Sequence, residues 1–449
     1  MFKKLTRNPF FLFLPFLFYY GYVIVHNKLP TLYGDEVRYF EFAQHLLNGY
    51  YSPPMPYINL WNGPGYPLLL TPFVALGIPA LYIILMNAVY LYLTIVFLYK
   101  ALSLLASRKI ALVLCLLLAI YPSALAILPI LYTEAVTYLL VSAFIYTVSL
   151  FYVKGKTKYA VIAGLVLGYL ILTKVIFGYV VVICLGTCLV GLLFRKYKSS
   201  YLRSVKILAI PFAVSVPYLC YTYSLTGKFF YWGNSGGMSL YWMSTPYEHE
   251  YGDWKNPNLL NRQYPALFKA KEVAKLLHDN HVKDIMYVLK EKPIEQDALY
   301  KQMAIANIKK HPMKFFQNYC NNVSRMLFNF PYSYSFQDAN IGRNIIIGSS
   351  IMWATVLGII MTLINWRRIT FPIKLVLLVT GVYLALSGAL SAYPRQLDVV
   401  IPVLLFWIGF LMANMQKLSL RFIEEENLDE IELTELTEMG MIMEDSGRV

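Results

Sequence analysis

Apolar segments recur along almost the whole chain and are separated by short polar connections. Most of them approach the length of about 20 residues that an α-helix needs to cross a bilayer. Thr173-Lys174 interrupts one long apolar stretch, and we interpret the residues on either side of it as two helices. The pattern predicts an all-α integral membrane protein with about ten transmembrane helices, at residues 9–26, 78–99, 110–128, 132–153, 159–173, 175–194, 205–225, 344–364, 371–391 and 397–415.

Two connections, residues 27–78 and 226–343, are too long to be turns and are predicted to form folded helical loops. The first is expected to combine a helix at 36–48, a proline-rich turn at 51–56 and a helix at 66–76. The second has an aromatic and glycine-rich stretch and then amphipathic helical patterns, at 231–242, 266–289 and 294–329, with Pro312 opening a further helix. Residues 1–423 are thus predicted to form one transmembrane domain, followed by an acidic cytoplasmic tail at 424–449.

Composition agrees with a membrane protein. The chain is 58% hydrophobic and 14% charged, whereas soluble globular proteins contain about 25% charged residues, and its mean hydropathy is +0.52. A soluble Rossmann-type enzyme, a nucleic-acid-binding module and a disulfide-rich secreted domain are therefore excluded. Basic residues gather in alternate short connections, such as Lys154, Lys156 and Lys158, and basic connections stay in the cytoplasm. We expect a multi-pass cell-membrane protein with both termini in the cytoplasm, both long loops outside and no nucleic-acid partner.

Acidic residues are scarce in the membrane portion and fall near the predicted outer face. Asp35 and Glu36 closely follow the first span, and Glu134 stands just after the third. An ionisable group within a span costs about 2.5 to 3.5 kcal/mol on insertion scales, so it needs a reason. One reason is structural: Asp35 would be a helix N-cap, and Glu36 and Glu134 would interact with helix dipoles. The other is chemical, because carboxylates that converge on one outer cleft suit proton abstraction from a hydroxyl group.

Two cations are predicted at the outer ends of spans, where membrane insertion least favours positive charge. They are Lys174 and Arg395. Arginine binds phosphate through paired donors and lysine acts as a point charge. Snorkelling to lipid headgroups is the structural alternative for both. Acids for a hydroxyl group and cations for a phosphate on the same face indicate group transfer from a lipid phosphate.

Several motifs resemble those of the GT-C superfamily of glycosyltransferases. Tyr33-Gly34-Asp35-Glu36-Val37-Arg38-Tyr39, followed by Leu46-Leu47-Asn48-Gly49 and Trp61-Asn62-Gly63-Pro64-Gly65-Tyr66-Pro67, resembles the first outer loop of the branch of protein O-mannosyltransferases and lipid A aminoarabinose transferases, glycosyltransferase family 39. Similar motifs follow in order at Thr133-Glu134-Ala135, Leu172-Thr173-Lys174, Gly236-Gly237 with Leu240-Tyr241, and Tyr393-Pro394-Arg395. The chain departs from this branch at Phe40, Lys174 and Gln396, where the branch has Ala, Arg and Tyr.

The resemblance implies a GT-C-like bundle that transfers a hexose or pentose from a polyprenyl-phosphate donor to an acceptor hydroxyl of a lipid, glycan or protein on the outer face. Asp35 would be the general base, with Glu36 and Glu134 as further catalytic acids, and Lys174 and Arg395 would bind the phosphate. The other substrate-binding residues that the resemblance implies are Arg38, Tyr39, Trp61, Asn62, Asn234, Tyr241 and Tyr393.

The sequence is compatible with a divalent metal ion but does not require one. The carboxylates and His249, which lies between Glu248 and Glu250, are acceptable ligand types, yet no ligand set is assigned, and the cofactor and the oligomeric state are left unknown. A polysaccharide or lipid-linked oligosaccharide transporter, a flippase or a polymerase would share the spans and the outward charges. Transporters and flippases tend to have internal repeats and acids near the bilayer midplane, and the sequence shows neither.

Overall fold

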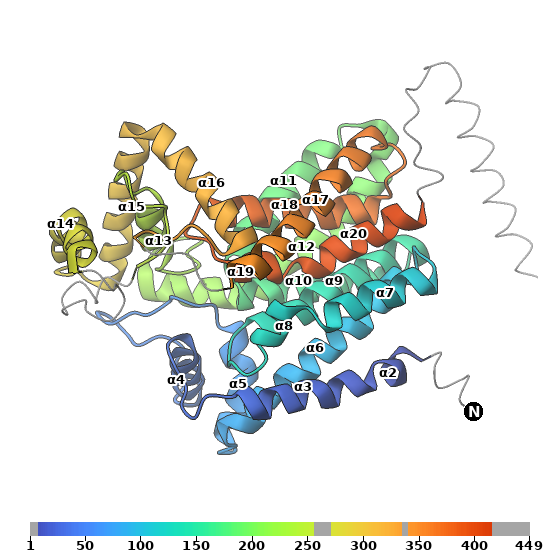
Figure 1. Cartoon of the computed structure of the whole chain (residues 1–449), viewed down its shortest axis with the longest axis horizontal. Coiled ribbons are helices and arrows are strands. Elements are labelled where there is room, and N and C mark those ends of the chain that lie inside the picture. The colour runs from blue at the N-terminus through green and yellow to red at the C-terminus, as the bar shows by residue number, and fades with distance from the viewer. Residues whose placement is uncertain (1–7, 256–270, 335–339, 415–449) are drawn as a thin grey trace, which may run out of the picture.

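The computed structural model describes residues 8–255, 271–334 and 340–414. Every regular element in these ranges is a helix (Figure 1). The helices are α2 (Pro9–Leu12), α3 (Leu14–Asn27), α4 (Asp35–Leu47), α5 (Gly65–Ala75), α6 (Ala80–Leu102), α7 (Arg108–Ala119), α8 (Pro122–Ala126), α9 (Glu134–Lys154), α10 (Thr157–Thr173), α11 (Ile176–Gly191), the short 3₁₀ helix η1 (Arg195–Tyr197), α12 (Lys198–Thr226), α13 (Gly236–Met243), α14 (Lys271–Val288), α15 (Pro293–Lys310), α16 (Pro312–Phe328), α17 (Ile341–Ile364), α18 (Phe371–Gly388), α19 (Pro394–Asp398) and α20 (Ile401–Ala413).

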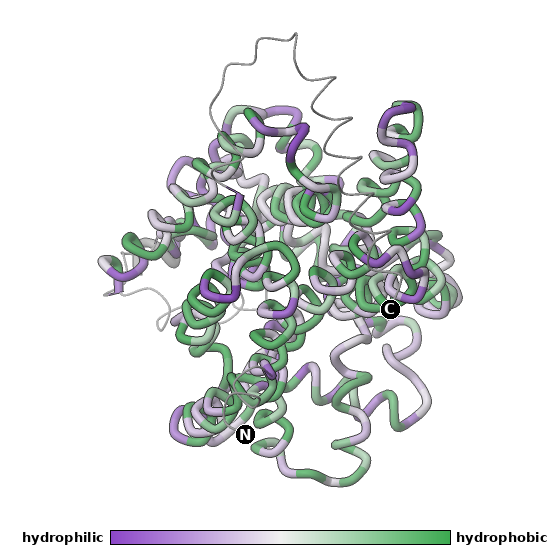
Figure 2. Tube along the Cα trace, turned by 90° about the vertical axis from the view of Figure 1, so that its right-hand side faces the viewer, coloured by the Kyte–Doolittle hydropathy of each residue, from purple (hydrophilic) through white to green (hydrophobic). Residues whose placement is uncertain are grey.

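The predicted class of an all-α membrane protein is confirmed. Within the described ranges, five helical segments are long and apolar enough to cross a membrane: Ala80–Leu102, Glu134–Lys154, Arg195–Thr226, Ile341–Ile364 and Phe371–Gly388. Shorter apolar helices complete the bundle, among them α10, α11 and α20. Hydrophobic residues predominate along the helices (Figure 2). The total of ten spans remains a prediction.

The predicted spans correspond to helices, but three of them are divided. Residues 9–26 form α2 and α3, with Phe13 between them. Residues 110–128 form α7 and α8 rather than one helix, because Pro122 opens a new helix and cannot continue the preceding one. Residues 397–415 include the end of α19 and then α20. The division of residues 159–194 at Lys174 is confirmed, since α10 ends at Thr173 and α11 begins at Ile176. The acidic tail, and residues 266–270 of the predicted amphipathic segment, lie outside the described residues.

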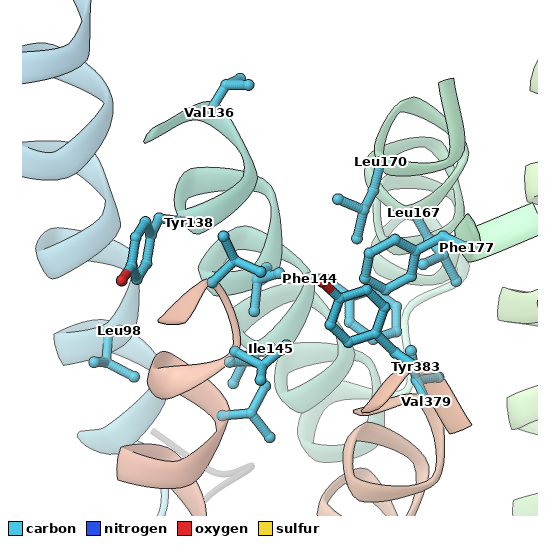
Figure 3. Close-up of a cluster of buried hydrophobic side chains, with 14 of the residues drawn as sticks. Leu98, Val136, Tyr138, Phe144, Ile145, Leu167, Leu170, Phe177, Val379 and Tyr383 are labelled. Carbon is cyan, nitrogen blue, oxygen red and sulfur yellow. The ribbon is translucent and has the colours of Figure 1, made fainter. Parts of the chain in front are cut away.

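The bundle is held by close packing of apolar side chains between α6, α9, α10, α11 and α18 (Figure 3). The rings of Phe177 and Tyr383 stack with centroids 4.6 Å apart and planes within 8° of parallel. Gly164 and Gly168 of α10 face α12 so closely that a Cβ on either would crowd Ile210 or Val214. Small residues four positions apart let membrane helices approach closely, and such packing is what holds helices together in lipid, which gives little hydrophobic drive for their association.

Both long loops lie at one end of the bundle, on the left in Figure 1, whereas the described chain begins at the right. The first loop contributes α4 and α5, close to the predicted helices at 36–48 and 66–76. The second loop contributes α13 to α16 and has an apolar core of its own, which includes Tyr241, Trp242, Leu277 and Tyr300. The elements that carry the predicted site residues are therefore gathered at this end of the molecule.

Candidate functional site

A cavity of about 290 Å³ opens where both loops meet the bundle. Four charged residues from distant parts of the sequence line it: Asp35, Glu134, Lys174 and Arg395. Asp35 begins α4, Glu134 begins α9, Lys174 lies between α10 and α11, and Arg395 lies in α19. The fold thus brings together the two acids and two cations that the sequence placed on one face.

Asp35 is the first residue of α4, and the N-cap is Gly34 rather than Asp35. Gly34 has φ +57° and ψ −117°, a conformation that a side chain would strain, so glycine is suited to this position. The Asp35 carboxylate pairs with Arg38 one turn later, and Arg395 Nη1 lies 3.4 Å from Asp35 Oδ2. The capping alternative is therefore wrong for Asp35, which faces two guanidinium groups and the cavity.

Glu134 and Lys174 form the second charged pair. Lys174 Nζ lies 3.0 Å from Glu134 Oε1, and the Glu134 side chain is only 2% exposed. Thr133 is the N-cap of α9, but its hydroxyl donates to Glu134 Oε2 at 3.4 Å instead of capping the helix. Lys174 has an extended backbone with φ −130°, which ends α10 and directs the chain into α11. The break in the apolar stretch thus places the cation beside the acid.

Glycines of the first loop set the position of this break. A Cβ on Gly63 would overlap the carbonyl oxygen of Leu172, and one on Gly65 would lie 2.7 Å from the backbone nitrogen of Thr173. Tyr169 also donates a 2.6 Å hydrogen bond to the carbonyl oxygen of Gly65. The Trp61–Pro67 segment therefore packs directly against the end of α10, immediately before Lys174.

Glu36 has a different environment from Asp35. Its side chain is buried and does not line the cavity. Oε1 accepts from the backbone N–H of Leu131 at 2.7 Å, and Oε2 from that of Tyr33 at 2.9 Å. Oε1 thus fastens the start of α4 to the segment before α9, whereas Oε2 holds the turn that leads into α4, and we assign no chemical step to Glu36.

Four predicted binding residues of the first loop form one group near Asp35. The Arg38 guanidinium stacks over the Trp61 ring at 5.0 Å, and Asn62 Nδ2 donates to the Tyr39 hydroxyl at 3.0 Å. Tyr39, Trp61 and Asn62 line the cavity. Burial raises the pKa of Tyr39, and the Asp35 and Glu134 carboxylates raise it further, so its phenol stays protonated. This group can hold a polar ligand next to the Asp35 carboxylate.

Three other predicted residues do not line the cavity. The carboxamide of Asn234 binds the backbone N–H of Leu60 at 3.0 Å, and so joins the two loops. Tyr393 donates to the carbonyl oxygen of Trp254 at 3.1 Å. Tyr241 lies in the core of the second loop, where its hydroxyl donates to Asp284 Oδ2 at 2.9 Å. Each of these three side chains thus makes a hydrogen bond outside the cavity that fixes its position.

Sequence reasoning missed several residues of the cavity wall. They are aromatic or hydroxyl side chains from α11, α13, α18 and the segments beside them: Tyr179, Trp232, Ser239, Tyr383, Ser387 and Ser391. Trp232 and Ser239 belong to the aromatic and glycine-rich stretch, which was singled out only as a whole. Tyr383 and Ser387 stand in an apolar span and gave no signal of their own. Aromatic faces with nearby hydroxyl groups provide surface for a polar ring.

In the Glu248–Glu250 segment only Glu250 is buried, where it joins a polar cluster, whereas Glu248 and His249 are exposed. Glu250 Oε2 lies 2.8 Å from His281 Nε2 and also accepts from the Thr245 hydroxyl. Burial alone would raise the pKa of Glu250, but the hydrogen bonds from His281 and Thr245 and the charge of His281 hold it below its ordinary value. Across the described ranges, no three His, Cys, Asp or Glu side chains gather closely enough to hold a metal ion.

Comparison with known proteins finds a family match over part of the chain. Residues 62–221, more than a third of the chain, match the model of a family described as dolichyl-phosphate-mannose-protein mannosyltransferase. This range includes Glu134 and Lys174. A comparison with curated protein sequences finds no significant match.

Among solved structures, the chain is similar to the archaeal oligosaccharyltransferase AglB from Archaeoglobus fulgidus, in complex with an inhibitory peptide and a dolichol-phosphate. The TM-score is 0.50 and the identity 13%, over 90% of this chain and 50% of that one, so the chain spans half the length of this relative. ArnT from Cupriavidus metallidurans, bound to undecaprenyl phosphate, aligns at a TM-score of 0.39 and 13% identity, over 90% of this chain and 78% of that one. The likeness to AglB supports the fold alone.

Proposed function

We propose that the chain transfers a sugar from a polyprenyl-phosphate donor to an acceptor hydroxyl group, with Asp35 as the general base. One observation carries this proposal: two carboxylates and two cations, from four separate parts of the chain, line one cavity at the loop end of a membrane bundle. Carboxylates serve to accept a proton, and fixed cations serve to stabilise a leaving phosphate. The matched family model, whose description names a dolichyl-phosphate-linked mannose, supports a donor of this class.

The donor phosphate would lie between Lys174 and Arg395. Each of these cations is already beside a carboxylate, Lys174 with Glu134 and Arg395 with Asp35. A phosphate in the cavity would compete for these donors and partly release the carboxylates. The guanidinium of Arg395 offers paired donors, whereas the ammonium of Lys174 offers a point charge. Entry of the donor would thereby release Asp35 from Arg395 and leave Arg38 as its remaining partner while it accepts a proton.

In the proposed reaction, the acceptor oxygen attacks the anomeric carbon of the sugar while Asp35 takes the proton from that hydroxyl group. A new carbon–oxygen bond forms, and the bond between the anomeric carbon and the phosphate oxygen breaks. The electron pair leaves with the polyprenyl phosphate, whose added negative charge is stabilised by Lys174 and Arg395. Because phosphate is a weak base, no acid has to protonate it. Glu134 would keep Lys174 in place and orient the acceptor.

The surroundings of the cavity fit a donor that arrives from the bilayer and an acceptor that arrives from the loop side. A polyprenyl chain stays in the hydrocarbon layer, whereas its phosphate lies at the surface. We infer that the loop end is extracytoplasmic, since the basic short connections were assigned to the cytoplasm. The sugar would lie against the aromatic and hydroxyl wall formed by residues such as Trp232, Tyr383 and Ser391. Either a hexose or a pentose is compatible with this wall.

Asp35→Asn tests the proposal directly. The amide keeps the size of the side chain but cannot accept the acceptor's proton, and loss of a general base costs about 10²- to 10⁴-fold in rate. We expect a loss of that size in sugar transfer. The measurement is mass spectrometry of the envelope glycan in a deletion strain, which lacks the glycan unless the wild-type chain is supplied. Glu41→Gln, an exposed acid on the same helix, is the matched control and should restore the glycan fully. Near-normal transfer by Asp35→Asn, at equal protein levels, would remove Asp35 from the chemistry.

A further inference from the structure

The helix α16 directs its apolar side chains away from the rest of the protein. Met313 and Phe316 are 67% and 60% exposed, and Cys320 is also exposed. Val323 and Leu327 are partly exposed. Spacings of three and four residues place all five on one side of the helix. The result is a continuous apolar stripe along the length of α16, with no described side chain burying its N-terminal part.

The opposite side of α16 is polar and buried. Asn318 Nδ2 donates to the carbonyl oxygens of Met243 and Thr245, each 3.0 Å away. The guanidinium of Arg325, which is fully buried, donates to three backbone carbonyl oxygens, those of Pro331 at 2.7 Å, Tyr251 at 2.6 Å and Ala392 at 3.2 Å. Rotating the helix to hide the stripe would leave these buried donors without acceptors, which is costly. The stripe is therefore held outward.

The stripe continues an apolar surface that belongs to a candidate membrane span. α16 packs next to α17 and runs obliquely across the end of the bundle, so that the two helices form a V (Figure 1). Only 17% of the most apolar stretch of α17 is buried, and Ile345 and Ile346 near its start are 47% and 69% exposed. Such a helix needs lipid around it. The lipid-facing surface of α17 thus leads directly to the stripe.

Basic residues flank the N-terminal end of the stripe. Lys309 and Lys310 close α15, are exposed, and stand just before Met313. An apolar face next to lysines is the pattern of a helix that lies in a membrane interface with anionic headgroups. We propose that α16 lies in the bilayer surface at the loop end, with its stripe among the acyl chains and Lys309 and Lys310 among the lipid phosphates.

Docking of α16 on lipid would also fix the segment that leads to Arg395. Asn322 Nδ2 donates to the carbonyl oxygen of Gly388 at 3.0 Å, and Arg325 Nη1 to that of Ala392. Gly388 ends α18, and Ala392 lies two residues before α19. The inner side of α16 thus holds the connection between α18 and α19, while its outer side rests on lipid.

A spin label on Cys320 tests this placement in the full chain. Cys220, the other exposed cysteine in the described ranges, is replaced by serine, and Cys115, Cys184 and Cys188 are buried. The labelled protein is reconstituted in vesicles of phosphatidylcholine and phosphatidylglycerol, and its collisions with oxygen and with a water-soluble nickel complex are measured. Two reference labels are placed in a Cys320→Ser background. The label on Ile346→Cys, at an exposed apolar position of α17, gives the lipid reference, and the label on Asp279→Cys, at an exposed polar position of α14, gives the water reference.

We expect the Cys320 label to collide mainly with oxygen, at a depth of about 5–10 Å below the headgroup boundary. Lys309→Glu with Lys310→Glu should make the label shallower in anionic vesicles and leave its depth unchanged in pure phosphatidylcholine. Collisions with nickel equal to those at Asp279→Cys would place the stripe in water and overturn the proposal. Protection from both reagents would place protein over the stripe and overturn it too, with dipolar broadening identifying that protein as a second copy.

Discussion

Lys174 and Arg395 each pair with a carboxylate, and in the proposed function each would also bind the donor phosphate. An ionised carboxylate as buried as Glu134 is unfavourable without a cationic partner, and Lys174 supplies one at 3.0 Å. Arg395 is 41% exposed and Asp35 25% exposed, so their pair is looser, at 3.4 Å. If a phosphate enters, the looser pair separates more easily. Binding of the donor would then activate the base before it disturbs Glu134.

We predict that Lys174→Ala and Arg395→Ala each reduce turnover of a purified polyprenyl-phosphate sugar by about 10- to 100-fold, because one charged hydrogen bond contributes roughly 1.5 to 3 kcal/mol. Arg395→Lys should recover only part of the loss, since a point charge replaces a paired donor. Lys156→Ala, which removes an exposed lysine outside the cavity, is the control. Lys174→Ala also leaves the buried Glu134 carboxylate without its cation. The double variant with Glu134→Gln removes that charge, so that a loss of turnover in a folded double variant reports the lost phosphate contact rather than misfolding. Unchanged kinetics in both alanine variants would favour lipid-headgroup snorkelling instead.

The sequence indicated the charged members of the site but not their partners. Asp35, Glu134, Lys174 and Arg395 were recognisable because each is an ionisable group where membrane insertion disfavours one. Which acid meets which cation depends on helix packing over hundreds of residues, and no local pattern encodes it. Tyr383 escaped detection for the related reason that an aromatic residue in an apolar span is typical of packing.

At the level of elements, contact between the first loop and the end of α10 determines where Lys174 lies. We predict that Gly63→Ala lowers both stability and turnover, because the added methyl group overlaps the carbonyl oxygen of Leu172 and overpacking costs about 1–3 kcal/mol. Gly186→Ala in α11 is the matched control, as no atom lies within 4 Å of its added Cβ. Thermal denaturation in detergent, followed by size-exclusion chromatography, measures the difference. Equal stability of the two variants would show that the loop can move away from α10 without loss.

Helices of the loops were predictable where the hydrophobic pattern is helical, although the expected cap at Asp35 is one residue off. The helix expected at 36–48 is α4, that at 66–76 is α5, and the break at Lys174 lies where the apolar stretch is interrupted. The division of residues 110–128 at Tyr121 was missed, although Pro122 was a local signal for it. The outward stripe of α16 was unpredictable, because its buried face is the polar one and burial therefore runs against hydropathy.

For the whole molecule, the two long loops lie at one end of the bundle, and we predict that this end faces the outside of the cell. In a background without the exposed cysteines, an impermeant thiol reagent should label Tyr57→Cys and Asp279→Cys in intact cells and should not label Lys156→Cys. Tyr57 is 76% and Asp279 is 55% exposed, so access is limited only by the membrane. Labelling of Lys156→Cys in intact cells would show that the topology is the reverse of the predicted one and that the cavity faces the cytoplasm.

The cavity is assembled from parts that the ribosome produces far apart in time. Glu134 and Lys174 can pair once α9 and α10 have been synthesised, whereas Asp35 must wait for Arg395, which emerges only after α18. Asp35 contacts two guanidinium groups in the folded protein. Until Arg395 has been synthesised, only that of Arg38, on the same helix, is present. A nascent chain or a truncated product that stops short of α19 would thus lack Arg395 and the buried helix α20, and it could not form the contact between Arg395 and Asp35. In the proposed function, an incomplete chain in the membrane would therefore be inactive.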